Sequence, residues 1–349
     1  MPKKIQKTSV IKIRKKIQKM KKIKIICTLG PSSFNPKILS VLKKEKVDIF
    51  RINLSHTDKK DIKKKILFLK KNNVQNICID TEGAQIRTTY TKRKYFLKKN
   101  TFINIGVENN FSNNKCINFY PRFNLEELRL NCLIYVGFES LCLRLIRKDK
   151  LENNYLCKVV KEGLLESKKG VHINKKIYLD PLTKKDIYAL QLGRKMKIKN
   201  YAISFVNSGK DLKIVKDIIG KNNKIISKIE TANAVKNLTN ISKNSNALLI
   251  DRGDLSRYIP IEKIPIIQER VISFANSARK PVYVATNLLE NMVINNLPTR
   301  AESNDIYSSL KQGSEGLVLA AETAIGKDPV NCVKFLKKCI LAFKNRKKK

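Results

Sequence analysis

Hydrophobic residues along the chain form short runs that alternate with longer amphipathic stretches from residue 22 onward. Runs rich in Ile, Val and Leu are typical of buried parallel strands, so we predict strands at 22–30, 47–54, 74–81, 201–206, 224–230, 247–251, 282–286 and 316–320. The stretches between them predict helices at 36–46, 58–71, 184–195, 211–219, 234–242, 261–277, 301–312 and 330–343. Strand–helix pairs in this succession predict an α/β fold, a closed (β/α)₈ TIM barrel rather than an open sheet.

One segment interrupts this alternation after the third predicted strand. It contains the strand-like pieces TFINIG, CLIYVG, LCLRLIR and NYLCKVV and no strong helix, and it is far longer than a normal strand–helix loop. We therefore predict a small all-β domain inserted at 89–169. Because it leaves the carboxyl end of a strand, where barrel enzymes keep their active sites, we expect it to act as a lid. The predicted division is a basic tail at 1–21, barrel at 22–88, the inserted domain, and barrel again at 170–345.

The chain is strongly basic, with 73 Lys and Arg against 29 Asp and Glu, a net charge of +44. Such a charge raises a nucleic-acid binder as one hypothesis. The basic residues are mostly Lys and lie along the whole chain, and Ile and Asn are abundant while Trp is absent. A/T-biased codon usage explains that composition without a nucleic-acid partner, and no RNP aromatic motif, Cys/His finger or basic zipper occurs. We expect the charge to attract anionic metabolites in a salt-dependent way.

Cysteine usage and the chain ends bear on the cellular compartment. None of the 8 cysteines forms C-x-x-C and only 2 histidines occur, which argues against a structural zinc site and indicates a reducing compartment. The basic segment 1–21 lacks the apolar core of a signal peptide, and we predict a disordered tail. No apolar run approaches the length of a membrane span. We therefore expect a cytoplasmic protein without membrane contact.

Polar side chains lie at or just after the ends of five of the predicted strands, where a barrel places its chemistry. They are Arg51, Asn53, Ser55 and His56 after the second strand, Asp80, Thr81 and Arg87 after the third, Lys228 and Glu230 on the fifth, Asp251, Gly253 and Asp254 after the sixth, and Thr286 after the seventh. The carboxylates offer oxygen ligands for Mg²⁺, and the cations and the glycine turn suit a phosphoryl group. Each motif alone is common by chance, but together they predict phosphoryl transfer.

These stretches resemble the pyruvate kinase family over about residues 22–343. The matching segments, in family order and spacing, are KIICTLGPSS, FRINLSH, IDTEGAQIRT, SKKGVHI, ISFV, KIISKIE, DRGDL, VATNLLENM, PTRAE and AAETA. The inserted segment also falls where the family places its lid domain. The resemblance implies an enzyme of glycolysis that transfers the phosphoryl group of phosphoenolpyruvate to ADP, giving pyruvate and ATP.

The resemblance also implies roles for individual residues. Glu230 and Asp254 match the Mg²⁺ ligands, and Lys228 and Arg51 match the cations that hold the phosphoryl group. The backbone N–H groups of Gly253 and Asp254 would receive the substrate carboxylate, and Thr286 would lie near the face where the enolate is protonated. The K⁺ ligands correspond to Asn53, Ser55, Asp80 and Thr81. Positions around the nucleotide correspond to Pro31, Asn53, His56, Arg87 and Lys169.

Several positions depart from the family pattern. Glu82, Ala84 and Gln85 stand where the family usually has Lys, Pro and Glu, and the acidic residue replaced by Gln85 accompanies K⁺ dependence, so the sequence leaves the cation preference open. The lid motif Asp-Asp-Gly is replaced by Gly137-Phe138-Glu139. Further replacements are Asp251 for Ala, Ser256 for Gly, Tyr258 for Glu, Asn287 for Gln and Ala320 for Ser.

Two functional hypotheses follow from the intact catalytic set and these departures. The first is an active pyruvate kinase, and the alternative is a catalytically weakened relative that binds ligand or a partner without efficient turnover. Asp251 bears on both, because an extra carboxylate there opposes substrate binding or points outward. The family's C-terminal domain has no counterpart in this sequence, so we expect no effector control through it, and we expect any homo-oligomer to form through barrel faces.

Overall fold

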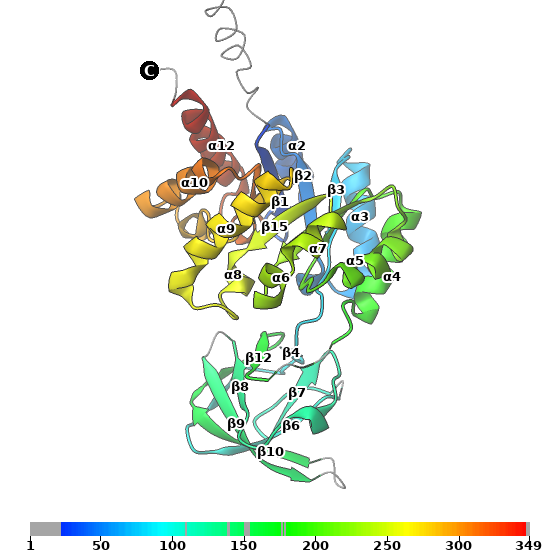
Figure 1. Cartoon of the computed structure of the whole chain (residues 1–349), viewed down its shortest axis with the longest axis vertical. Helices are drawn as coiled ribbons and strands as arrows, with labels where there is room; N and C mark the ends of the chain where they lie inside the picture. The colour runs from blue at the N-terminus through cyan, green and yellow to red at the C-terminus, as the bar shows by residue number, and fades with distance from the viewer. Residues whose placement is uncertain are drawn as a thin grey trace, which may run out of the picture.

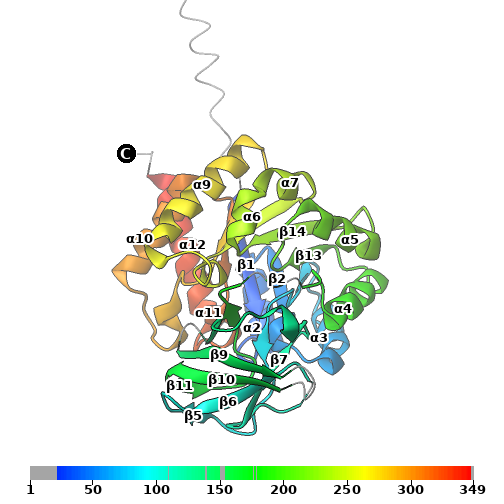
Figure 2. The same ribbon diagram turned by 60° about the horizontal axis from the view of Figure 1, so that its bottom comes forward.

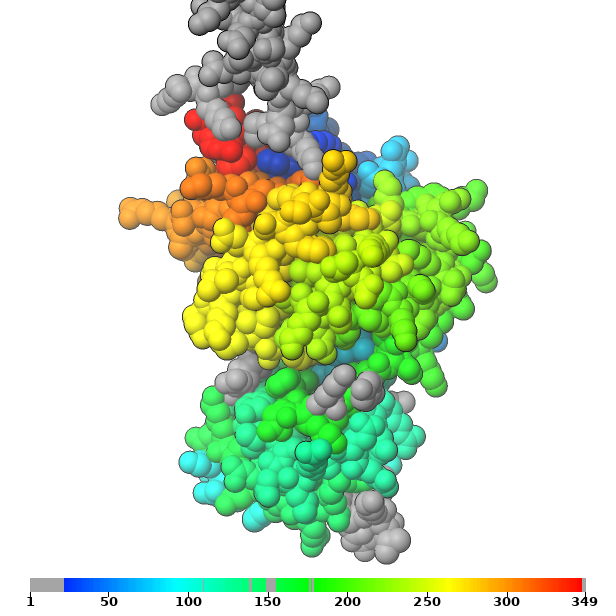
Figure 3. Space-filling model, in the orientation of Figure 1, coloured from blue at the N-terminus to red at the C-terminus, as the bar shows by residue number. Residues whose placement is uncertain are grey.

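The structure is a computed structural model that describes residues 22–346 except 109, 138–139, 150–153, 176 and 178. The predicted basic tail at 1–21 lies outside the described residues. The chain folds into a helix-wrapped barrel and a β domain attached to one end of it (Figure 1). Figure 3 shows these as two lobes that meet at a narrow waist. Within the described residues, no helix is both long and apolar enough to cross a membrane.

The barrel consists of parallel strands and confirms the predicted fold class. Going round it from the first strand, the order is β1-β17-β16-β15-β14-β13-β3-β2, and β2 pairs with β1 to close it. The bounds are β1 (Lys24–Leu29), β2 (Ile49–Asn53), β3 (Ile77–Asp80), β13 (Asn200–Ile203), β14 (Lys224–Ile229), β15 (Ala247–Asp251), β16 (Val282–Ala285) and β17 (Gly316–Leu319). Figure 2, turned toward the β domain, shows these strands in the middle of a ring of helices.

Alternation along the strands creates two hydrophobic layers. Ile26 on β1, Ile226 on β14 and Val318 on β17 belong to a small buried cluster inside the barrel. Neighbours with the opposite orientation, such as Cys27 and Ile225, join the larger cluster between strands and helices. The apolar interior gives way to polar side chains at the carboxyl ends of the strands, and this change positions the site described below.

The helices cover the outside of the barrel. Their bounds are α2 (Pro36–Lys44), α3 (Ile62–Lys71), α4 (Lys184–Lys195), α5 (Gly209–Ile219), α6 (Ala232–Lys236), α7 (Leu238–Lys243), α8 (Arg252–Leu255), α9 (Ile264–Ser277), α10 (Arg300–Gln312), α11 (Ala321–Ala324) and α12 (Pro329–Asn345). Single turns of 3₁₀ helix are η1 (Leu54–His56), η2 (Lys59–Asp61), η3 (Leu125–Glu127), η4 (Ile261–Lys263) and η5 (Glu290–Val293).

One predicted helix is wrong in detail, because the single helix at 234–242 is two short helices, α6 and α7. The break lies at Asn237, whose backbone (φ −102°, ψ 18°) leaves helical geometry. Its side-chain amide donates to the backbone oxygen of Asn207, 2.8 Å away. Asparagine side chains compete with helical hydrogen bonds in this way, so the residue interrupts an otherwise periodic pattern.

The β domain lies between β3 and α4 in sequence and has its own buried core, which includes Ile117, Leu143 and Val159. Its larger sheet has the order β12-β8-β9-β10-β6-β7-β4, and β11 pairs with β5 in a second sheet. The bounds are β4 (Arg87–Thr88), β5 (Tyr95–Leu97), β6 (Phe102–Gly106), β7 (Cys116–Tyr120), β8 (Leu133–Val136), β9 (Leu141–Asp149), β10 (Asn154–Lys161), β11 (Gly163–Leu165) and β12 (Val171–Ile173). The sheet therefore extends past the predicted bounds 89–169 on both sides, because β4 and β12 pair with strands inside them.

Candidate active site

A buried lysine lies at the centre of the charged groups at the barrel mouth. The ammonium nitrogen of Lys228, on β14, lies 2.7 Å from a carboxylate oxygen of Glu230, 3.3 Å from one of Asp251 and 3.6 Å from one of Asp80. It also donates a hydrogen bond to the hydroxyl of Ser204, 3.1 Å away. A charge this deeply buried persists only when it is paired, and here three strands supply the partners.

A second cation stands beside this lysine. The guanidinium of Arg51, only 3% exposed, pairs with Asp80 at 3.1 Å and donates to the hydroxyl of Thr28 at 2.8 Å. Asp80 contacts both Arg51 and Lys228, and strand register explains this, since Asn53 of β2 lies opposite Asp80 of β3. The two cations therefore share one buried carboxylate and lie close enough for both to contact a single anion.

Three carboxylates gather on the neighbouring strand ends. One oxygen from each of Glu230, Asp251 and Asp254 lies within 4.8 Å of the other two. One oxygen of Glu230 accepts the backbone N–H of Phe205 at 2.6 Å, which leaves the other directed at Lys228. A set of carboxylate oxygens at this spacing suits Mg²⁺, which prefers oxygen ligands, so the residues present fit the metal that the family implies.

The crowding of like charges changes the ionisation of these groups. Burial raises the pKa of Glu230 well above its ordinary value, Asp254 and Asp251 add to the effect, and Lys228 opposes it only in part. Burial would also raise the pKa of Asp251, but Lys228 and Arg51 outweigh it and hold that pKa below its ordinary value. Burial would lower the pKa of Lys228, but the negative charges of Asp80, Glu230 and Asp251 outweigh it and raise that pKa. The lysine therefore stays charged.

One of the two backbone donors predicted for the substrate carboxylate has a partner within the protein. The N–H of Gly253 donates to the Thr286 hydroxyl at 2.9 Å. Thr286 itself has a φ of 70°, which is costly for a β-branched residue. Arg252 donates to the backbone oxygen of Thr286 and thereby holds it in that conformation.

The four predicted K⁺ ligands lie at the neighbouring ends of β2 and β3. The Asn53 side chain accepts the N–H of Ser55 at 2.9 Å, and the Ser55 hydroxyl accepts from Arg87 at 3.4 Å. The Thr81 hydroxyl accepts the N–H of Ser204 at 2.9 Å, and Asp80 pairs with Arg51 as described. The residues are brought together, but each also has a protein partner.

Gln85, the position linked to K⁺ dependence, contacts a candidate Mg²⁺ ligand. Its amide nitrogen donates to a carboxylate oxygen of Asp254 at 3.4 Å. Its buried amide oxygen has no hydrogen-bond partner among the described residues. The predicted link between this position and a monovalent cation therefore has a physical basis, since an oxygen without a donor can serve a cation, while K⁺ ligation itself stays a prediction.

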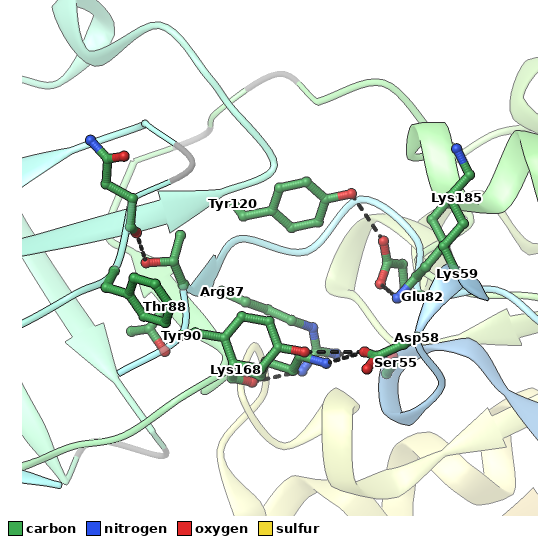
Figure 4. A pocket seen from close by; sticks show the side chains of 13 residues that line it. Ser55, Asp58, Lys59, Glu82, Arg87, Thr88, Tyr90, Tyr120, Lys168 and Lys185 are labelled. Carbon is green, nitrogen blue, oxygen red and sulfur yellow. Dashed lines mark hydrogen bonds and ion pairs between the residues drawn. The ribbon is translucent and has the colours of Figure 1, made fainter. Parts of the chain in front are cut away.

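A cavity of about 310 Å³ lies between the end of β2 and the β domain (Figure 4). It is lined by Ser55, Asp58, Lys59, Glu82, Arg87, Thr88, Thr89, Tyr90, Asn110, Phe111, Tyr120, Lys168 and Lys185. Of the predicted nucleotide residues only Arg87 lines it. Pro31, His56 and Lys169 are exposed and do not line it, and Lys169 pairs with Glu166 at 2.9 Å.

Sequence reasoning missed most of the residues that line this cavity. The Glu82 carboxylate pairs with Lys185 and accepts from the Tyr120 hydroxyl at 3.2 Å, and Lys168 pairs with Asp58 at 3.2 Å (Figure 4). These partners come from distant segments of the chain, so no local sequence motif predicts them. The one local signal is the capping-box spacing of Thr183 and Asp186, which marks the start of α4, the helix that carries Lys185.

Asp186 also links the two parts of the barrel that flank the inserted domain. Besides closing the capping box with Thr183 at the start of α4, its carboxylate accepts the backbone N–H groups of Glu82 and Gly83, at 2.9 and 3.0 Å. Burial and the neighbouring Glu82 raise the pKa of Asp186 to about 6. The turn that leads from β3 toward the β domain is therefore tied to the helix that follows the domain.

Aromatic rings connect the β domain to the barrel on the other side of the site. Tyr258, which follows α8, meets His172 of β12 edge to face with ring centroids 5.2 Å apart, and His172 stacks on Tyr135 of β8 at 6.1 Å. The Arg257 guanidinium packs so close to Gly170 that a Cβ there would overlap it. Of the altered lid motif, Phe138 and Glu139 lie outside the described residues.

Comparison with known proteins agrees with this geometry. The family described as "Pyruvate kinase, barrel domain" matches residues 20–333. Pyruvate kinase of Thermotoga maritima is 32% identical over 91% of this chain and 70% of its own length, and that of Clostridium perfringens is 34% identical over 89% and 68%.

A plant relative extends the comparison. Plastidial pyruvate kinase 2 of Arabidopsis thaliana is 32% identical over 89% of this chain, which spans only 55% of that protein. The chain thus spans between 55% and 70% of the length of these three relatives. Because the family model covers most of the chain and the fold is a closed barrel, the chain belongs to the pyruvate kinase family.

Proposed function

We propose that this protein is a pyruvate kinase that transfers the phosphoryl group of phosphoenolpyruvate to ADP, giving pyruvate and ATP. The observation that carries the proposal is the joint placement of Lys228 and Arg51 around Asp80, next to the carboxylates of Glu230 and Asp254. Phosphoryl transfer needs little from a protein beyond positioning and charge neutralisation. This arrangement offers both at a single point of the barrel mouth.

Each residue has a defined part in the proposed reaction. Glu230 and Asp254 would hold Mg²⁺, which supplies Lewis-acid stabilisation to the enolate oxygen left when the phosphoryl group departs. Lys228 and Arg51 neutralise the phosphoryl oxygens during transfer, an effect that is strong because both cations are buried. Thr286 lies beside Gly253, at the edge of the same group of residues, where a hydroxyl can relay the proton that converts enolate to pyruvate.

The nucleotide and the monovalent cation complete the proposal. ADP would bring its phosphates toward Arg87 and Lys168, which border the cavity beside the strand ends, and the exposed ring of Tyr90 lies close to them (Figure 4). K⁺ would bind among Asn53, Ser55, Asp80 and Thr81, at two neighbouring strand ends where Asn53 lies opposite Asp80.

The direct test is a coupled assay of pyruvate formation with the full chain, Mg²⁺, phosphoenolpyruvate and ADP, with and without K⁺. Lys228→Met should lower kcat by roughly a thousandfold, because the phosphoryl group loses a buried counter-charge. Exposed Lys213 of α5 provides the matched control, and Lys213→Met should retain wild-type turnover. Circular dichroism must show that both variants are folded. A well-folded wild-type protein that forms no pyruvate under any of these conditions would contradict the proposal.

One observation favours the second candidate, a weakened relative that binds ligand without efficient turnover. Asp251 places an additional carboxylate 3.3 Å from Lys228, inside the group of residues that would hold an anionic substrate. Thermal unfolding separates the two candidates, since a binding protein is stabilised by phosphoenolpyruvate and Mg²⁺ even when pyruvate does not form. Stabilisation accompanied by turnover supports the enzyme instead.

A further inference from the structure

The side chain of Asp251 points into the site from the end of β15. The residue is 5% exposed, and one carboxylate oxygen lies 3.3 Å from the Lys228 ammonium nitrogen. The other carboxylate oxygen lies next to Gly253, where an added Cβ would come within 3.7 Å of it and within 3.6 Å of the Thr286 hydroxyl. The carboxylate therefore sits between Lys228 and the turn at Gly253.

These surroundings match what the carboxylate of a small anionic substrate would need. A backbone N–H, a nearby ammonium group and adjacent metal ligands are the usual partners of a bound carboxylate. Lys228 provides the ammonium group and Glu230 and Asp254 the metal ligands, and the Asp251 carboxylate already lies against Lys228. The inference rests on the proposed function. We propose that Asp251 competes with the carboxylate of phosphoenolpyruvate for its binding position and thereby sets a weak affinity for that substrate.

The charge balance points the same way. With every group ionised, Lys228 and Arg51 contribute +2 and Asp80, Glu230, Asp251 and Asp254 contribute −4, so the site carries 2 − 4 = −2. A bound Mg²⁺ brings this sum to zero, whereas the same site without Asp251 would reach +1. Phosphoenolpyruvate is a multiply charged anion, so the extra carboxylate weakens its electrostatic attraction to the Mg²⁺-loaded site.

Neutralising Lys228 does not require Asp251. The ammonium group pairs with Glu230 at 2.7 Å and with Asp80 at 3.6 Å, and both partners stay in place when Asp251 is replaced. The pairing is therefore redundant for the lysine, while the Asp251 carboxylate takes up space beside the turn at Gly253, which bears directly on a ligand. This is why we assign Asp251 to substrate discrimination and not to support of the lysine.

The experiment measures binding by isothermal titration calorimetry on the full chain with Mg²⁺, using oxalate as a planar dicarboxylate mimic of the pyruvate enolate. Asp251→Ala should lower the Kd for oxalate at least tenfold, because it removes a like charge and clears the space between Lys228 and the turn at Gly253. Asp251→Asn, which keeps the volume and loses the charge, should give an intermediate gain and provides the test if the alanine variant does not fold. Asp217→Asn, at an exposed position of α5, is the control and should bind like wild type.

Steady-state kinetics and a Mg²⁺ titration without oxalate complete the design. The inference predicts a lower KM for phosphoenolpyruvate in Asp251→Ala with a smaller change in kcat. Unchanged or weaker oxalate binding in both variants overturns it. Loss of Mg²⁺ affinity in Asp251→Ala would also overturn it, since Asp251 would then be a metal ligand. If wild type and variants neither bind oxalate nor turn over phosphoenolpyruvate, the proposed function itself fails.

Discussion

Three carboxylates surround the ammonium group of Lys228, and their mutual repulsion governs how the ionisation of the site changes with pH. The pKa of Glu230 lies well above its ordinary 4.5 because the side chain is buried among other acids. The metal-free folded protein therefore keeps a proton on Glu230 at pH values where the unfolded chain has lost it. The stability that this proton brings is present at acidic pH and declines as pH rises through the raised pKa.

From this we predict that Mg²⁺ binding releases a proton and strengthens with pH. A ligand carboxylate must be ionised, so Mg²⁺ affinity should rise by up to about tenfold per pH unit below the pKa of Glu230 and level off above it. Calorimetry at several pH values between about 6 and 9, in buffers of different ionisation enthalpy, measures both affinity and proton release. Glu230→Gln should bind Mg²⁺ weakly at every pH. A wild-type affinity that does not change with pH would contradict the prediction.

The sequence predicts which residues meet at the site better than it predicts what they contact. Alternation places Lys228 and Glu230 on one face of β14, and the structure brings them to 2.7 Å. Alternation also gives the direction of Asp251, because Ala247 and Leu249 of the same strand face the barrel interior and the backbone of Asp251 is still extended. The functional roles of these residues stay proposals.

At the level of elements, the local pattern of hydrophobic residues predicts strands and helices well where burial is regular. All the predicted barrel strands exist, since each needs only a short apolar run with neighbours on both sides. The one-turn helices α8 and α11 were missed because four residues are too few to show helical periodicity. The strand order of the inserted sheet could not be derived either, as pairings such as β12 with β8 depend on contacts between distant segments.

The contact between the barrel and the β domain leads to an element-scale prediction. Tyr258→Ala removes the edge-to-face contact with His172, an interaction worth about 0.5–1.5 kcal/mol beyond the area it buries. Amide hydrogen exchange in β12 and β8 should accelerate by roughly two- to tenfold, while the barrel strands keep their protection. Exchange followed by mass spectrometry resolves these segments separately.

A second aromatic contact supplies the matched control for that variant. Tyr307 of α10 meets Phe343 of α12 edge to face at 5.8 Å, entirely within the barrel. Tyr307→Ala should loosen those two helices and leave exchange in β12 unchanged. Equal exchange rates in β12 for wild type and Tyr258→Ala would show that the aromatic contact does not hold the β domain in place.

For the whole molecule, the dominant physical property is a net charge of +44, carried mainly by lysines distributed along the chain. Such a field draws small anions toward the surface over distances of about one Debye length, which is about 10 Å at 0.1 M salt. The cavity beside the strand ends concentrates the same sign, with Lys59, Arg87, Lys168 and Lys185 in its wall. Both proposed substrates are anions, so their encounter with the protein should be faster than that of neutral molecules.

This leads to a prediction about ionic strength. At constant Mg²⁺ and K⁺, raising the concentration of tetramethylammonium chloride from about 0.02 to about 0.5 M should lower kcat/KM for phosphoenolpyruvate by roughly tenfold, because screening weakens steering of an anion. The buried pair of Lys228 and Glu230 lies out of reach of mobile ions, so kcat should change far less. Sucrose at matched viscosity separates screening from slowed diffusion. If kcat/KM stays constant across the salt series while wild-type turnover is intact, the lysine excess does not steer substrate, and its explanation lies in composition alone.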